Sequence, residues 1–189
     1  VVPVSPESTE ISDITSGGEG YSQGRNLAAA KNLYHKIIAA DIEPKLPLYL
    51  IKAMVANALA ESKLDPNAAG DCKSDSKAIN VPNKGTCCSF GLWQYNICGG
   101  LGINYLNKNN DPSNVNNKLK VLQNYELQIQ FMVNYLKTFS STVKPDSTKT
   151  VGEWVDWFVE QIEKPANIPQ AKANRKILAD KLERAGAFP

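Results

Sequence analysis

The segment LYLIKAMVANALAES at residues 48–62 constrains the fold of this chain more than any other. Lys52, Asn57 and Glu61 are nearly its only polar residues, so apolar side chains surround the helix that it forms. A helix that is apolar on every side has to be covered by other elements. We therefore expect this helix at the centre of the domain.

The end of this helix places Glu61 in the last helical turn. The helix must stop near Lys63, because Asp65 precedes Pro66 and is pushed out of the helical region. There the negative end of the helix dipole and the apolar surroundings both favour the protonated carboxyl group of Glu61. Such a group can donate the proton that a leaving sugar oxygen needs. The ordinary alternative is a Glu that reaches solvent beside Lys63.

Two further helices are indicated by apolar residues that recur every three or four positions. The first covers residues 23–40, and the second is a longer helix that follows Asp111-Pro112. The apolar stripe of this longer helix consists of Val115, Leu119, Leu122, Tyr125, Ile129, Met132, Leu136 and Phe139. The stripe is typical of core packing and implies no cofactor.

Near the C-terminus, Thr150 and Glu153 predict a capping box at the start of a helix that ends before Pro165. A last helix is expected from about Gln170 to Arg184. The chain shows no strand-rich region and no internal repeat. The expected class is therefore mainly α, with a single domain at 23–189.

Residues 64–114 are rich in Gly, Asn, Pro, Ser and Cys, which predicts loops, at most a small β-hairpin, and short helices around GLWQY and GLGINYL. This loop-rich lobe should face the central helix, with a binding groove between the two. Residues 1–22 combine Pro, Ser, Gly and acidic residues without helical periodicity, so they are expected to form an arm or linker.

Four cysteines lie close together in the loop-rich region and nowhere else: Cys72, Cys87, Cys88 and Cys98. This clustering favours disulfide bonds and an oxidising destination. A bond between adjacent Cys87 and Cys88 would be strained, which leaves 72–87 with 88–98, or 72–88 with 87–98. A structural zinc site is the competing interpretation, but the spacing lacks its usual paired hooks.

Charge and hydropathy exclude several classes of function. The net charge of +2 comes without a clustered Lys/Arg run, so no nucleic acid is expected as a partner. No segment approaches the ~20 apolar residues that span a bilayer, and Val1 begins a polar segment, so we expect a soluble protein with any leader outside this sequence. His35, the single histidine, has no nucleophile motif beside it and is assigned no role.

Several short motifs resemble the lysozyme-like superfamily, and most closely the phage tail lysozymes and the soluble lytic transglycosylase-type muramidases. The chain has Glu61-Ser62, then Pro66, Asn67, Ala68, Gly70 and Asp71, then the run Ser89-Phe90-Gly91-Leu92-Trp93-Gln94. A later element, Ile162-Glu163-Lys164-Pro165-Ala166, is similar to the Phe-Glu-Arg-Pro element of those proteins, with Arg175 beyond it. The resemblance covers residues 24 to about 180 and implies a lysozyme-like helical fold.

The resemblance also implies roles for individual residues. Glu61 would be the catalytic acid, and the Gly-Leu-x-Gln turn would line the sugar groove. Asp71 is the first choice for a second carboxylate, because it follows Glu61 by ten residues in a Gly-Asp turn, a spacing similar to that in phage-type lysozymes. A cysteine-bearing insertion between Asp71 and Cys88 departs from the family pattern, and Asp75 is the second choice. The alternative for Asp71 is a side chain that only hydrogen-bonds its own turn.

Substrate contacts are expected from Ser62, Ser89, Gln94 and Tyr95. Gln94 offers both a donor and an acceptor, and the face of Tyr95 can lie against a sugar ring. Ser62 would either steady an N-acetyl group or cap the end of its helix. Glu19 is a rival acid in Gly17-Gly18-Glu19-Gly20, but no apolar helix precedes it and its neighbours favour mobility.

These features indicate a muramidase that cuts between N-acetylmuramic acid and N-acetylglucosamine without metal or cofactor. Its partners would be peptidoglycan strands and other phage tail or virion proteins, and its location extracellular or virion-associated, in the wall or periplasm. One alternative is a lytic transglycosylase with Glu61 as sole acid and base. Others are a silent wall-binding or virion structural module on this fold, and a disulfide-stapled inhibitor or adhesion domain.

Overall fold

The computed structural model describes residues 23–109 and 118–189, so the expected arm at 1–22 lies outside the described residues. The helices are α1 (Gln23–Ala40), α2 (Leu48–Ser62), α3 (Leu101–Asn109), α4 (Lys118–Leu122), α5 (Tyr125–Lys137), α6 (Val151–Phe158), the π-helix η2 (Val159–Glu163) and α7 (Ile168–Arg184). The strands are β1 (Ala69–Cys72), β2 (Ile79–Val81), β3 (Gly85–Phe90) and β4 (Tyr95–Asn96). The predicted mainly-α, lysozyme-like class is confirmed.

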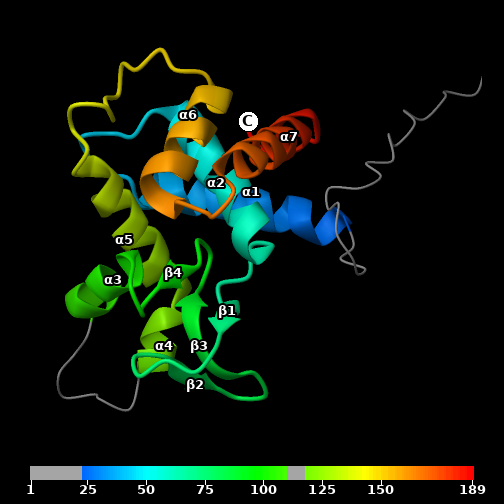
Figure 1. Cartoon of the computed structure of the whole chain (residues 1–189). Coiled ribbons are helices and arrows are strands. Elements are labelled where there is room, and N and C mark those ends of the chain that lie inside the picture. Colours follow the sequence, from blue (N-terminus) through cyan, green and yellow to red (C-terminus); the bar gives the residue numbers. More distant parts are fainter. Residues whose placement is uncertain (1–22, 110–117) are drawn as a thin grey trace, which may run out of the picture.

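The helices and strands form two lobes (Figure 1). The helical lobe contains α1, α2, α6, η2 and α7, and the sheet lobe contains the four strands with α3 and α4. Helix α5 joins the lobes, because it packs on α1 at one side and on α3 at the other. None of the described helices is both long and apolar enough to cross a membrane.

Helix α2 occupies the centre of the helical lobe, as its composition predicts. It packs against α1, α6 and α7, and most of its residues are buried. Lys63 follows it in the left-handed region with φ 56°, and its N–H donates to the oxygen of Leu59 at 3.1 Å. A left-handed residue ends a helix, so Glu61 lies in the last turn as expected.

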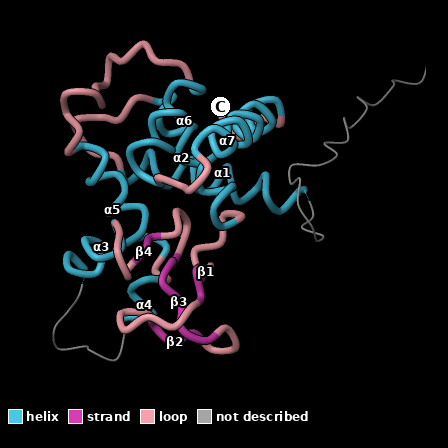
Figure 2. The backbone as a smooth tube through the Cα atoms, in the orientation of Figure 1, coloured by secondary structure: helices cyan, strands magenta, loops and turns pink. Residues whose placement is uncertain are grey.

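The sheet has four strands, whereas the sequence predicted at most a hairpin of two. Its strands are antiparallel in the order β1-β3-β2, and β4 pairs with the far end of β3 (Figure 2). The strands are short and contain Gly, Asp and Cys, so they lack the alternating pattern that would have identified them.

The register between strands β1 and β3 explains which of the two disulfide patterns forms. Cys72 lies directly opposite Cys87 in the β1–β3 ladder, and these two residues are bonded. Adjacent residues of a strand point to opposite faces, so Cys88 cannot share that face and bonds Cys98 instead. No described cysteine is free.

The prediction of one long helix after Pro112 is wrong in one respect. Within the described residues it is two helices, α4 and α5, and Val115 of the stripe is not among the described residues. The break falls at Asn124, whose side chain accepts a hydrogen bond from the N–H of Leu127 and caps α5. The apolar periodicity continues through the break because both helices bury their apolar residues in one core.

The short helix predicted at GLWQY is also wrong. Residues 91–94 form a turn, with Gly91 at φ 77° and Gln94 at φ 47°. Two left-handed residues cannot belong to a right-handed helix. The short helix predicted at GLGINYL is present as α3.

The C-terminal helices agree with the sequence. The Thr150–Glu153 capping box is formed at the start of α6, and the predicted last helix is α7. Helix α6 continues into η2, and Lys164 follows η2 in the left-handed region before Pro165. The turn of η2 therefore carries Glu163 to the end of the helical lobe beside α7.

Candidate active site

A cleft of about 710 Å³ lies between the two lobes. The helical lobe contributes Glu61 and the end of η2, and α5 contributes Met132 and Tyr135. The sheet lobe contributes Lys73, Asp75, Ser89, Trp93, Gln94, Tyr95, Asn96, Cys98, Gly99, Gly100, Leu101 and Asn104. Glu61 and Glu163 thus lie on the helical wall, whereas Asp75 and most of the amide and hydroxyl groups lie on the sheet wall.

Glu61 is held on the helical wall by an arginine from α7. Its Oε1 accepts a hydrogen bond from Nη2 of Arg175, and the two groups form an ion pair. The side chain of Glu61 is 24% exposed, whereas that of Arg175 is 9% exposed. The carboxyl group therefore has one side toward the protein and one side open to the cleft.

A second carboxylate contacts the same arginine. Oε2 of Glu163 lies 2.8 Å from Nε of Arg175, and the Glu163 side chain is only 4% exposed. Neither carboxyl oxygen of Glu163 has a hydrogen-bond partner with suitable geometry in the described structure. Arg175 thus lies between two glutamates from two different helices.

The surroundings of Glu163 favour its neutral form. Burial, together with the nearby charge of Glu61, raises the pKa of Glu163 to about 8, although Arg175 acts in the opposite direction. An isolated buried carboxylate is costly, so the group keeps its proton to a higher pH than usual. The sequence indicated Glu163 and Arg175 only through the Phe-Glu-Arg-Pro-like element, because periodicity cannot show that two helix ends meet.

The two candidates for a second catalytic carboxylate lie in different places. Asp71 is exposed, has φ 50°, pairs with Lys73 at 3.2 Å, and accepts a hydrogen bond from Asn96 at 3.3 Å. It is not among the residues that line the cleft, whereas Asp75 is. Asp75 also accepts a hydrogen bond from the N–H of Lys77 at 2.8 Å, which fixes its loop. The geometry thus favours Asp75, and the role of either group stays a prediction.

The predicted substrate contacts divide in the same way. Ser62 is buried, lies outside the cleft lining, and donates to the carbonyl oxygens of Ala58 at 3.0 Å and Leu92 at 2.9 Å. Ser89 and Gln94 line the cleft, and the Gln94 side chain is half-buried and donates to Gly91 O at 3.0 Å. Gln94 is therefore better placed than Ser62 to meet a sugar.

Tyr95 lines the cleft but is only 2% exposed. Its ring stacks on Tyr105 with centroids 5.1 Å apart, and its hydroxyl donates to the carbonyl oxygen of Gln128 at 2.9 Å. Trp93 is similarly buried and donates through Nε1 to Met54 O at 3.0 Å. Both rings serve the core, so Tyr95 offers little of its face to a sugar.

Gln128 is a supporting residue that the sequence did not reveal. It is fully buried in α5 and accepts from the N–H of Leu92 at 2.8 Å. Its Nε2 donates to the carbonyl oxygens of Pro66 at 2.9 Å and Leu122 at 2.7 Å. These bonds fix the 91–94 turn against the loop that follows α2. The available signal was its position three residues after Tyr125 and four before Met132, on the apolar side of the helix.

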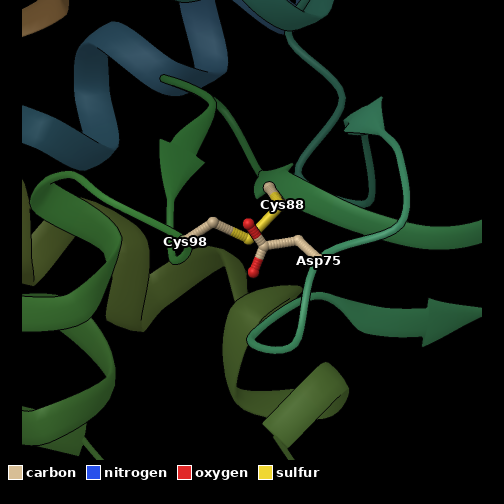
Figure 3. Close-up of side chains that lie close together, drawn as sticks. All are labelled: Asp75, Cys88 and Cys98. Carbon is tan, nitrogen blue, oxygen red and sulfur yellow. A yellow bond between two sulfur atoms is a disulfide. The ribbon is translucent and has the colours of Figure 1, made fainter.

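Asp75, Cys88 and Cys98 bring ligand-type atoms within 4.8 Å of one another in the sheet lobe (Figure 3). The two sulfur atoms are joined in a disulfide, so neither is a free thiolate. A thiolate is the form of cysteine that binds a metal. The competing zinc interpretation therefore has no free cysteine ligands among the described residues.

Comparison with known proteins identifies the family. The family model described as phage tail lysozyme matches residues 28–184, which include both walls of the cleft. No curated protein gives a match.

Proposed function

Because the chain belongs to the phage tail lysozyme family, we propose that it cleaves the glycosidic bond between N-acetylmuramic acid and N-acetylglucosamine with Glu61 as general acid. Family membership supports a peptidoglycan-degrading, lysozyme-like function in a phage tail and virion-associated action on the cell wall. The observation that carries the role of Glu61 is its position, one side fixed by Arg175 and the other open to the cleft.

The cleft suits a glycan strand that enters with its scissile bond over Glu61. Proton transfer to the leaving oxygen requires a fixed carboxyl group within hydrogen-bond reach. Gln94, Asn96 and Asn104 on the sheet wall supply donors and acceptors for hydroxyl and N-acetyl groups. The helical wall thus supplies the acid and the sheet wall orients the sugar.

After the first proton transfer, two outcomes differ in the nucleophile. A hydrolase uses a second carboxylate to direct water or stabilise the positive sugar ring, and we assign this role to Asp75 because it lines the cleft on the opposite lobe. In a lytic transglycosylase Glu61 would return as base, and the 6-hydroxyl of the sugar would attack. Asp71 does not line the cleft, so this second outcome follows unless Asp75 takes part.

The test is digestion of purified peptidoglycan by the wild type and by Glu61→Gln, with mass spectrometry of the released muropeptides. Reducing ends identify a hydrolase and anhydro ends a transglycosylase. The variant should lose at least about 100-fold in either product. Glu160→Gln is the matched control, since Glu160 is exposed on η2 and pairs with Lys172. Absence of release by the wild type on walls of several types would favour a silent wall-binding module.

A further inference from the structure

Glu163 is a buried carboxyl group on the cleft wall for which the proposed reaction has no use. It shares Arg175 with Glu61, so two carboxyl groups depend on one guanidinium. Arginine stays protonated at every pH that a protein survives. If both glutamates were ionised, the three side chains would carry a net charge of −1 in a mostly buried site.

One proton removes that excess charge. Burial and the Glu61 carboxylate raise the pKa of Glu163, so near neutral pH this proton belongs on Glu163 in the empty cleft. Glu61 is then ionised and paired with Arg175. This is the wrong state for a general acid, because an acid catalyst must carry its proton when the substrate binds.

We infer that Glu61, Arg175 and Glu163 form one unit that holds a single proton, stored on Glu163 in the open cleft and transferred to Glu61 when a glycan strand covers it. This inference rests on the proposed function. Glu163 is a positioning residue in this scheme, since it acts on the reaction through Arg175 and Glu61.

The transfer leaves the charge of the unit unchanged. Glu163 loses one proton, Glu61 gains one, and Arg175 remains a cation that pairs mainly with Glu163 afterwards. Substrate drives the change because it displaces the water that solvates the exposed side of Glu61, while Glu163 is already dehydrated and loses nothing further. The 2.8 Å separation of Nε and Oε2 means that Arg175 already contacts Glu163 and needs little movement.

The other charged groups around Glu163 do not compete for this proton. Helix α2 presents Glu61 and α7 presents Arg175, and these are the charges that act on it. On its own turn, Glu160 is exposed and forms an ion pair with Lys172 of α7. The neighbouring Lys164 is exposed. The unit therefore has three members.

The first test observes the stored proton without any substrate. Carboxyl carbons of glutamate are labelled with carbon-13 and titrated by NMR in the wild type, Glu163→Gln, Glu61→Gln and the control Glu160→Gln. We expect one glutamate to titrate near pH 8, in line with the raised pKa of Glu163, and to vanish in Glu163→Gln. In Glu61→Gln its midpoint should fall, because a repelling charge is lost and Arg175 has one partner left. In Glu160→Gln it should be unchanged.

The second test distinguishes proton storage by Glu163 from a purely structural role of this residue. In Glu163→Gln, Arg175 keeps Glu61 ionised, so the high-pH limit of muropeptide release should move down by about one pH unit or more. A merely structural role would lower release equally at every pH.

The outcomes distinguish the two claims. Suppose that the wild type releases muropeptides. If all of its glutamates then titrate in the ordinary range, or if Glu61→Gln leaves the raised midpoint unchanged, the stored proton alone is overturned. A coupled titration in a wild type that releases nothing from any wall would overturn the proposed function and, with it, the transfer to Glu61.

Discussion

At the scale of single residues, the cleft depends on side chains that hold others in place. Gln128 is the clearest example, because one fully buried amide bonds to the backbone at Pro66, Leu92 and Leu122. Gly91 lies against it, and a Cβ at that glycine would clash with the side-chain amide of Gln128. Neither residue touches substrate in our proposal, yet both shape the turn that presents Gln94.

Gln128→Leu should therefore destabilise the protein strongly. The substitution keeps the approximate volume but leaves the Leu92 N–H and two carbonyl oxygens without partners. Each unsatisfied buried group costs about 1–3 kcal/mol, so we expect a loss of about 3 kcal/mol or more in the free energy of unfolding. Urea denaturation measures it. The control is Gln123→Leu, which removes one exposed bond of 3.3 Å to Asn67 and should cost less than about 1 kcal/mol.

The two aspartates provide a second prediction at this scale. Asp75→Asn should lower muropeptide release by about tenfold or more if a second carboxylate takes part, because Asp75 lines the cleft. Asp71→Asn should change release by less than about twofold, since Asp71 is exposed and does not line the cleft. Initial rates on one peptidoglycan preparation decide this, and the reverse order would restore Asp71 as the second group.

At the scale of elements, the sequence predicted what depends on local chemistry. The position of Glu61 followed from Pro66 and an apolar helix, and the start of α6 followed from Thr150 and Glu153. The break between α4 and α5 was missed because apolar periodicity continues across Asn124. An Asn before Tyr-Glu-Leu was a capping signal, but it looked no different from a polar residue on the exposed face.

The sheet lobe shows why other features could not be predicted. Strand β3 contains Gly85, Thr86 and two cysteines, and neither periodicity nor β-propensity identifies it. Its register also selects between the two disulfide patterns, and register is a property of the folded ladder. In the same way, the meeting of Glu61 with Arg175 and Glu163 requires α2, η2 and α7 to be packed together.

The two disulfides should have different effects on function. Cys98 lines the cleft beside Gly99 and Gly100, whereas neither Cys72 nor Cys87 does. Both bonds close short loops, with sequence separations of 15 and 10, so each should stabilise by about 3 kcal/mol.

We therefore compare Cys88→Ser/Cys98→Ser with Cys72→Ser/Cys87→Ser. Thermal unfolding should show a similar loss of Tm in both double variants. Muropeptide release at a temperature where both remain folded should fall several-fold further in the first, because the sheet wall of the cleft loses its tether. Equal activity in the two variants would mean that the Cys88–Cys98 bond serves stability alone.

At the scale of the whole molecule, the cleft lies between two lobes that are stabilised in different ways. The helical lobe is built around α2, whose apolar sequence predicts that it is buried. The sheet lobe is held together by two disulfides and by the hydrogen bonds of Gln128. In our proposal the acid comes from the first lobe and most polar sugar contacts come from the second. Function therefore requires the lobes to keep their relative position, which α5 provides by packing on both α1 and α3.

The buried glutamate makes the stability of the whole molecule depend on pH. In the unfolded chain Glu163 should titrate near its ordinary value of 4.5, whereas burial raises its pKa to about 8 in the folded protein. Between these two values the folded protein holds a proton that the unfolded chain has released. The free energy of unfolding therefore falls as pH rises through this window, by at most about 1.4 kcal/mol per pH unit for one proton.

Glu163→Gln should remove this slope, because a neutral amide has no proton to lose. Urea unfolding of the wild type and the variant at pH steps across the window gives the difference in stability at each pH. We expect the stability of Glu163→Gln relative to the wild type to increase steadily toward pH 8. The stability of Glu160→Gln should follow that of the wild type at every pH. A constant difference between wild type and Glu163→Gln would mean that Glu163 is ionised across the window, with Arg175 compensating its burial completely.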